Sequence, residues 1–102
     1  MKKYTVEFSE ESKDDFVNLS NAIKYEYRLP LTAFRYLREL RKEIYKLQSA
    51  ADAFQIQTRA SLLQYGTNVR RINYKKMAVI YTIHGDIVYI HRIVPASLIT
   101  GL

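Results

Sequence analysis

The sequence lacks cysteine, and glycine and proline are scarce, with three and two residues in a chain of 102. The absence of cysteine excludes disulfide bonds and thiolate metal sites, and it is compatible with a reducing compartment. Long disordered linkers are unexpected where glycine and proline are so few. The apolar and charged fractions, 48% and 25%, are those of an ordinary globular protein. We therefore predict a single domain over residues 1–102.

Long apolar runs are missing as well. No run reaches the roughly 18 apolar residues of a membrane-spanning helix, so we predict no membrane association. The first apolar run ends at Phe8, and four acidic residues follow closely: Glu10, Glu11, Asp14 and Asp15. Such a segment lacks the apolar centre of a signal peptide. The sequence therefore predicts a cytoplasmic protein.

Acidic residues are outnumbered by basic ones. Sixteen lysines and arginines stand against ten aspartates and glutamates, which gives a formal net charge of +6. A positive charge favours nucleic acid or an acidic protein as the partner. Many small soluble proteins carry such a charge for solubility alone, so both interpretations stay open.

The N-terminal half has the pattern of one strand and two helices. Residues 3–8 alternate apolar and polar, which predicts a half-buried strand, and Ser9 is a favourable N-cap residue. Apolar residues then recur at helical spacing and predict a first helix over about 10–27: Phe16, Leu19, Ile23 and Tyr27. Pro30 interrupts this helix and suits the first turn of a second one. That second helix carries its own apolar stripe: Ala33, Leu37, Leu40, Ile44 and Leu47.

The pattern changes after about residue 51. Residues 50–60 are ambiguous and predict a loop or a frayed helix end. Short β-type runs follow at 69–74, 77–83 and 87–94, with a possible extra strand at 61–65, and turn-forming residues separate them. The order β-α-α-β-β-β predicts an α+β fold, in which a helical hairpin packs on one face of a mostly antiparallel sheet.

Cations interrupt the apolar pattern of the predicted sheet. Arg70 and Arg71 open the first run of the hairpin region, and His91 and Arg92 lie inside the last. A cation in an apolar strand lies on the solvent face or is paired, because unpaired burial is costly. Since side chains alternate between faces, the sheet is expected to bury one surface and to present cations to an anionic partner on the other.

No cofactor or metal site is predicted. His84 and His91 are the only histidines, and no carboxylate pattern accompanies them. A glycine-rich phosphate loop, a nucleophile elbow and an HExxH motif are absent from the sequence.

Metal-independent RNA cleavage needs only a base, an acid and cations that stabilise the charged phosphate. The sequence offers these groups: Arg70, Arg71, Lys75, Lys76, His91 and Arg92, with Tyr65, Tyr74, Tyr81 and Tyr89. Each also has an ordinary structural interpretation. Strand tyrosines such as Tyr81 and Tyr89 commonly pack, turn lysines are commonly solvated, and a sheet histidine is commonly hydrogen-bonded.

The chain as a whole resembles the RelE/ParE family of toxins from type II toxin–antitoxin systems. The opening YTVEFSEESKDDF is similar to the family's first strand and the start of its first helix. The segment VRRINYKKMAVIYTIHGDIVYIHRIVPAS is similar to its closing sheet. The resemblance covers nearly the whole chain and implies the βααβββ toxin fold and a cognate antitoxin protein, with a role in stress response or plasmid maintenance.

The family's branches have different targets. RelE-like toxins cleave mRNA on the ribosome, whereas ParE-like toxins inhibit DNA gyrase. Ala78 and Ser97 stand where the ribonuclease branch commonly has arginines, and the ParE-like pattern fits better at Arg71 and Arg92.

The resemblance therefore implies a growth inhibitor that binds its target and forms a hetero-oligomer with an antitoxin. The residues expected to contact the target are Arg70, Arg71, Lys75, Lys76 and Arg92. The alternatives are a RelE-like endonuclease that uses Arg71, His91 and Arg92, and a family member that binds a partner without toxicity.

Overall fold

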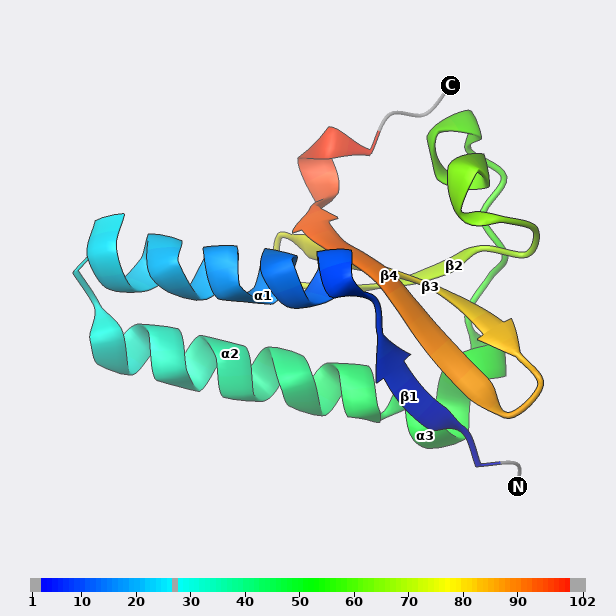
Figure 1. Cartoon of the computed structure of the whole chain (residues 1–102), viewed down its shortest axis with the longest axis horizontal. Helices are drawn as coiled ribbons and strands as arrows, with labels where there is room; N and C mark the ends of the chain where they lie inside the picture. Colours follow the sequence, from blue (N-terminus) through cyan, green and yellow to red (C-terminus); the bar gives the residue numbers. More distant parts are fainter. Residues whose placement is uncertain (1–2, 27, 100–102) are drawn as a thin grey trace.

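The computed structural model describes residues 3–26 and 28–99. It contains a four-stranded sheet of β1 (Thr5–Phe8), β2 (Arg70–Tyr74), β3 (Met77–His84) and β4 (Ile87–Pro95). The strand order is β1-β4-β3-β2, with β1 parallel to β4 and the other pairs antiparallel. The helices α1 (Glu10–Asn21) and α2 (Pro30–Tyr45) pack on one face of this sheet (Figure 1). The predicted α+β fold of βααβββ order is confirmed.

Helix α1 begins where Ser9 caps it. The Ser9 hydroxyl oxygen accepts a hydrogen bond from the Ser12 backbone N–H at 3.0 Å, which satisfies a free donor of the first turn. The same hydroxyl donates to the His91 carbonyl at 2.8 Å. One serine therefore starts the helix and ties it to β4.

The predicted first helix is divided into two parts. α1 ends at Asn21, and one turn of π-helix, Ala22–Glu26, continues it; Tyr27 lies outside the described residues. Pro30 occupies the first turn of α2 as predicted. The second apolar stripe continues into a short α3 (Leu47–Ala50) and a 3-10 turn, Ala51–Ala53.

The main core lies between the helices and the sheet. Tyr81 is its largest fully buried side chain, and its hydroxyl donates to the Ala51 carbonyl at 2.6 Å. Burial raises the pKa of Tyr81 above its usual value. The prediction that Tyr81 packs in the core is confirmed. The other buried members of this core are Tyr4, Leu40, Ile44, Leu47, Ala51, Ile72, Met77, Val79, Val88, Ile90 and Ile93.

A smaller apolar cluster covers part of the opposite face. The 3-10 helix η3 (Ala60–Tyr65) places Leu62 and Tyr65 against Ile80 and Val94. The prediction of a short strand at 61–65 is therefore wrong. Residues three apart share one side of a 3-10 helix, so the spacing of Leu62 and Tyr65 suits this conformation. β3 is covered on both faces from Met77 to Thr82, which explains its continuous apolar run from Met77 to Tyr81.

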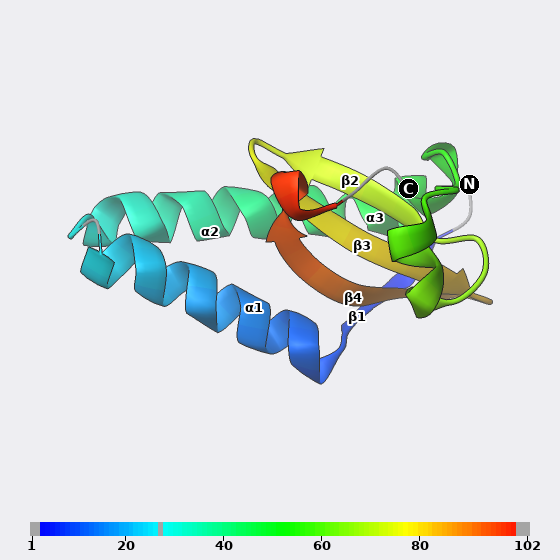
Figure 2. The same cartoon turned by 90° about the horizontal axis from the view of Figure 1, so that it is seen from above.

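The helical hairpin extends beyond the sheet. Figure 2 shows α1 and α2 side by side, with their connected ends projecting away from the strands. The ends of the two helices nearest β1 and β4 lie beside the sheet (Figure 1). The described part of the chain has no helix that is long and apolar enough to cross a membrane.

Candidate functional site

The face of the sheet opposite the helices brings Arg71 and Arg92 into one row. Arg71 pairs with Ile80 across β2 and β3, and Ile80 pairs with Arg92 across β3 and β4. Neighbouring strands lie about 4.8 Å apart, so the two arginine backbones are roughly 10 Å apart. Ile80 and Thr82 are buried at the centre of this side of the sheet, and we call the surface around them, with Arg71, His91 and Arg92, the open face.

Arg92 is paired within the protein. Its Nε and Nη2 donate to the Asp15 carboxylate at 2.7 and 2.9 Å, and Glu11 lies 3.7 Å away. Asp15 also accepts the backbone N–H of Ile93 at 2.9 Å. The hydrogen bond to Asp15 raises the pKa of Arg92 above its usual value. This arginine joins α1 to β4, and its charge is largely neutralised.

Arg71 is different. It is half-buried on the open face, and its side chain makes no hydrogen bond or ion pair with any residue in 3–26 or 28–99. A guanidinium that keeps its five donors free is suited to a carboxylate or a phosphate. Of the predicted residues, Arg71 is the one that presents an unpaired cation on the open face.

The other predicted cations point elsewhere. The Arg70 guanidinium donates to the carbonyls of Asp52, at 3.0 Å, and Phe54, and so holds the chain that leads from the helices to η3. The Lys75 ammonium lies 5.6 Å from the ring centres of both Tyr36 and Tyr74, on the helical side. The Lys76 side chain is exposed in the turn between β2 and β3. The structure therefore does not gather the five predicted binding residues into one patch.

A hydroxyl joins the two histidines. The Thr82 Oγ1 lies 2.7 Å from the Nε2 of His84 and 2.7 Å from the Nε2 of His91. A hydroxyl has one hydrogen and two lone pairs, so Thr82 donates to at most one of the two imidazoles, and an imidazole N–H at this site donates to its oxygen. Thr82 is almost fully buried. The sequence analysis missed its role, although the spacing of Thr82 and His84 by two residues already placed them on one strand face.

His91 sits at an irregularity of β4. Ile80 pairs with Arg92 and Tyr81 with Ile90, so His91 is an extra residue with no partner of its own on β3. Its ring contacts Tyr89 at 4.9 Å and Tyr65 at 5.4 Å between centroids. Burial, and then the proximity of His84, lower the pKa of His91. The lowered pKa favours the neutral form of His91, which is the form that accepts a proton.

Among residues 3–26 and 28–99, the open face offers acid–base groups and the unpaired cation of Arg71. Within the described residues, no three histidine, cysteine, aspartate or glutamate side chains could hold a metal ion together. Ala78 is buried in β3, and Ser97 is exposed in the 3-10 turn Ala96–Leu98. Neither position supplies a charge to the open face.

Comparison with known proteins identifies a structural relative. No protein-family model matches the chain, and no curated protein matches it in sequence. A chain from a solved structure, described as the chromosomal ParDE TA system from P. aeruginosa, superposes with a TM-score of 0.72. The match covers 91% of this chain and 96% of that chain at 13% sequence identity. This protein therefore shares its fold with a chain of a ParDE toxin–antitoxin system.

Proposed function

We propose that this protein is the toxin of a type II toxin–antitoxin system and acts in the cytoplasm. It inhibits growth by binding a macromolecular target, such as DNA gyrase, and a cognate antitoxin neutralises it in a hetero-oligomer. The shared fold with a chain of a ParDE system supports the proposal. So does the sequence pattern, in which uncharged Ala78 and Ser97 occupy the positions of the nuclease arginines.

The observation that carries the proposal is the unpaired Arg71. Its strand, β2, forms an edge of the sheet, and the side chain projects from the open face. Arg92 has Asp15 as an internal partner and so has little charge left for a target. We therefore assign target binding to Arg71 and a structural role to Arg92.

Growth after induced expression tests this assignment. Wild-type protein and an Arg35→Ala control should both arrest growth, because Arg35 is an exposed cation on α2, away from the open face. Arg71→Ala should relieve the arrest while leaving the thermal unfolding midpoint within a few degrees of wild type. Full toxicity of a folded Arg71→Ala variant would overturn the assignment.

The state of cellular DNA tests the target. If gyrase is inhibited, plasmid DNA isolated after induction loses negative supercoils, and purified protein blocks supercoiling by gyrase in vitro. Unchanged supercoiling during a full arrest would exclude gyrase. Normal growth with abundant folded protein would favour a member of this fold that binds a partner without toxicity.

A ribosome-dependent mRNA endonuclease is the second candidate, favoured by the imidazole pair at Thr82. When His91 donates through Nε2, its Nδ1 is unprotonated and can take the proton of a ribose 2′-hydroxyl as that oxygen attacks the phosphate. The protonated His91 Nδ1 would then return this proton to the leaving 5′-oxygen as the P–O5′ bond breaks and a 2′,3′-cyclic phosphate forms, and Arg71 would stabilise the anionic phosphate.

Mapping of mRNA ends separates the two candidates. Primer extension on translated mRNA after induction should show new 5′ ends at codon positions only if the protein is a nuclease. These ends should disappear in His91→Ala and persist in Arg35→Ala. Arrest without new ends would exclude the nuclease.

A further inference from the structure

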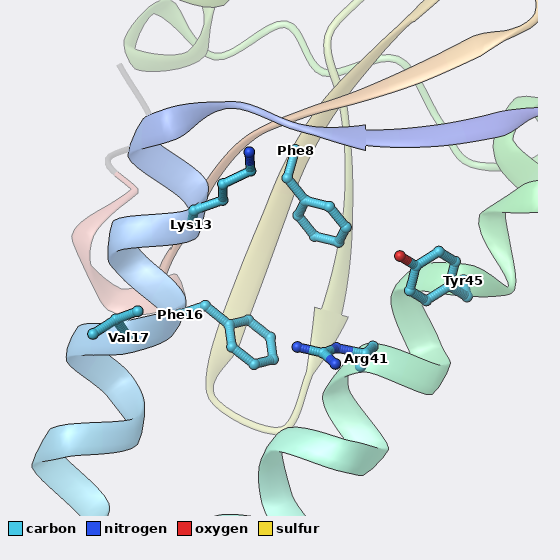
Figure 3. A pocket seen from close by; sticks show the side chains of 6 residues that line it. All are labelled: Phe8, Lys13, Phe16, Val17, Arg41 and Tyr45. Atoms are coloured by element: carbon cyan, nitrogen blue, oxygen red, sulfur yellow. The ribbon is translucent and has the colours of Figure 1, made fainter.

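Among the residues that the structure describes, no histidine, cysteine or carboxylate lines the hollow between α1, α2 and β1. Its lining is apolar, aromatic and cationic (Figure 3): Phe8, Lys13, Phe16, Val17, Arg41 and Tyr45. Cations repel a metal ion, and hydrocarbon side chains offer it no lone pair. The imidazoles of this protein, which are the side chains that zinc and copper prefer, lie instead on the open face.

Both histidines of the sequence point toward one atom. The Nε2 of His84 and the Nε2 of His91 each lie 2.7 Å from the Thr82 Oγ1. Because both distances end at the same oxygen, the two nitrogens are separated by at most twice that distance. His84 and His91 are the only histidines of the chain. The fold therefore brings all of its imidazoles to a single point on the open face.

Strand register and packing hold this arrangement. Thr82 and His84 are two residues apart on β3, so they share one face of the sheet. His91 is the extra residue of β4, and such a bulge re-aims the side chain that it carries. The His91 ring also contacts the rings of Tyr65 and Tyr89. His91 is thus held in place, whereas His84 is exposed beside the turn and can rotate toward it.

Two converging imidazole nitrogens suit a divalent transition-metal ion. Imidazole is a preferred ligand of Zn²⁺, Cu²⁺ and Ni²⁺, whereas Mg²⁺ and Ca²⁺ require oxygen ligands. Zn–N bonds of about 2.0–2.1 Å place two nitrogens of a tetrahedral ion roughly 3.4 Å apart, a separation that rotation of the exposed His84 ring can reach. Each ring then carries its proton on Nδ1, and the ion replaces the Thr82 hydroxyl as the partner of both Nε2 atoms.

We propose that His84 and His91 together bind one divalent transition-metal ion through their Nε2 atoms. No third histidine, cysteine, aspartate or glutamate completes the set among residues 3–26 and 28–99, so water fills the remaining positions. Four-ligand zinc sites have dissociation constants from tens of nanomolar to picomolar, and half of that binding free energy corresponds to roughly 1–200 µM. The bound ion ties β3 to β4 and adds positive charge to the open face. This site does not depend on the proposed function.

Calorimetric titration of the untagged protein with Zn²⁺ tests the site directly. We expect one ion per molecule, with a dissociation constant in this micromolar range, and no binding of Mg²⁺. A second measurement follows the imidazole nitrogens by NMR, because coordination shifts the Nε2 resonance of both histidines. Saturating Zn²⁺ should also raise the thermal unfolding midpoint, since the unfolded chain does not hold the two rings together.

Variants show whether the two rings act as one set of ligands. His84→Gln and His91→Gln should each weaken Zn²⁺ binding roughly a hundredfold, which is about the contribution of one ligand to a four-ligand site. His84 is exposed, so His84→Gln is expected to fold and carries the test even if His91→Gln is unstable. Asp14→Asn removes an exposed carboxylate of α1 and is the matched control, with an affinity within about twofold of wild type.

Four results would overturn the proposal. Two ions per molecule, each lost with one histidine, would mean that the rings bind separately. Zinc-dependent dimers in sedimentation would mean that the ion bridges two molecules. Unchanged affinity in both histidine variants would indicate an adventitious ion only, and an absence of Zn²⁺ binding at millimolar concentration would exclude the site. None of these outcomes bears on the proposed function, because they are measured on the purified protein alone.

Discussion

At the residue scale, the contact between Asp15 and Arg92 has the greatest consequence for the fold. These residues are 77 positions apart, and the Asp15 carboxylate accepts three hydrogen bonds, two from Arg92 and one from the Ile93 backbone. The side chain of Asp15 is 13% exposed and that of Arg92 is 31% exposed. The pair is thus shielded more than a surface ion pair and satisfies a backbone donor at the edge of β4.

Asp15→Ala should destabilise the protein by roughly 2–4 kcal/mol, because it leaves a backbone N–H without an acceptor and a partly buried guanidinium with only the exposed Glu11, 3.7 Å away, as its partner. Urea denaturation measures this loss. Glu10→Ala is the matched control, since its pair with Lys13 is exposed and should cost less than about 0.5 kcal/mol. Equal, small effects of the two substitutions would show that the Asp15 contact contributes little.

His91 gives a second prediction at this scale. The pKa of His91 is lowered in the folded state from its ordinary value of 6.5, chiefly by burial. Below pH 6.5, His91 binds a proton more readily in the unfolded chain than in the folded protein. His91 therefore stabilises the fold fully above pH 6.5, and this contribution is lost as the pH falls through its lowered folded-state pKa.

Chemical denaturation at pH 7.5, 6.0 and 5.0 tests this linkage. The difference in unfolding free energy between wild type and His91→Gln should shift in favour of the variant as the pH falls. The difference between the two unfolding free energies removes the contribution of the carboxylates, because these titrate in both proteins. Groups that face His91 are Tyr65, Thr82, His84, Tyr89 and Glu11, and they remain in the variant. A pH-independent difference would contradict the assignment.

At the element scale, the start of α1 depends on one side chain. Ser9 caps the helix and also donates to the His91 carbonyl of β4, so the helix and the strand share a hydrogen-bonding residue. Such a contact sets where the helix begins and how it meets the sheet. The helix ends less sharply, because a π-helical turn rather than a cap follows Asn21.

Ser9→Ala should therefore cost about 1–2 kcal/mol in unfolding free energy, since it removes an N-cap and a tertiary hydrogen bond together. Ser9→Asp should recover part of this loss, because a carboxylate can cap the helix but cannot donate to the His91 carbonyl. Ser49→Ala in α3 is the control for loss of an exposed hydroxyl. If Ser9→Ala matches that control, the cap does not set the helix start.

At the scale of the whole molecule, the open face and the helical hairpin lie on different sides of the sheet. Arg71 belongs to the open face, whereas α1 and α2 pack on the other face. Residues that face different layers and share no partner act independently.

Arg71→Gln should consequently leave the cost of Ser9→Ala unchanged. The double variant should show the sum of the two separate changes in unfolding free energy, to within about 0.5 kcal/mol, in urea denaturation. A larger deviation from additivity would mean that the open face and the start of α1 are coupled.

Local periodicity was sufficient to predict most elements of the fold. The alternation at 3–8 and the apolar stripes of the two helices each mark one buried face, and such a pattern predicts the element. β3 was predicted instead from its continuous apolar run, because both of its faces are covered. The segment at 61–65 was mistaken for a strand, because a short apolar run fits a strand and a 3-10 turn equally well. The spacing of the apolar residues did not indicate that the first helix divides into α1 and a π-helical turn.

The sequence by itself determined the α+β order of elements, the positive charge and the presence of cations within apolar strands. Only the tertiary structure decided which cation is free, because Asp15 reaches Arg92 through the packing of α1 on β4, and no local spacing encodes that approach. The tertiary structure likewise joined His84 and His91 at Thr82 through strand register. A residue pattern indicates which side of one helix or strand is buried, whereas a functional site depends on which elements pack together.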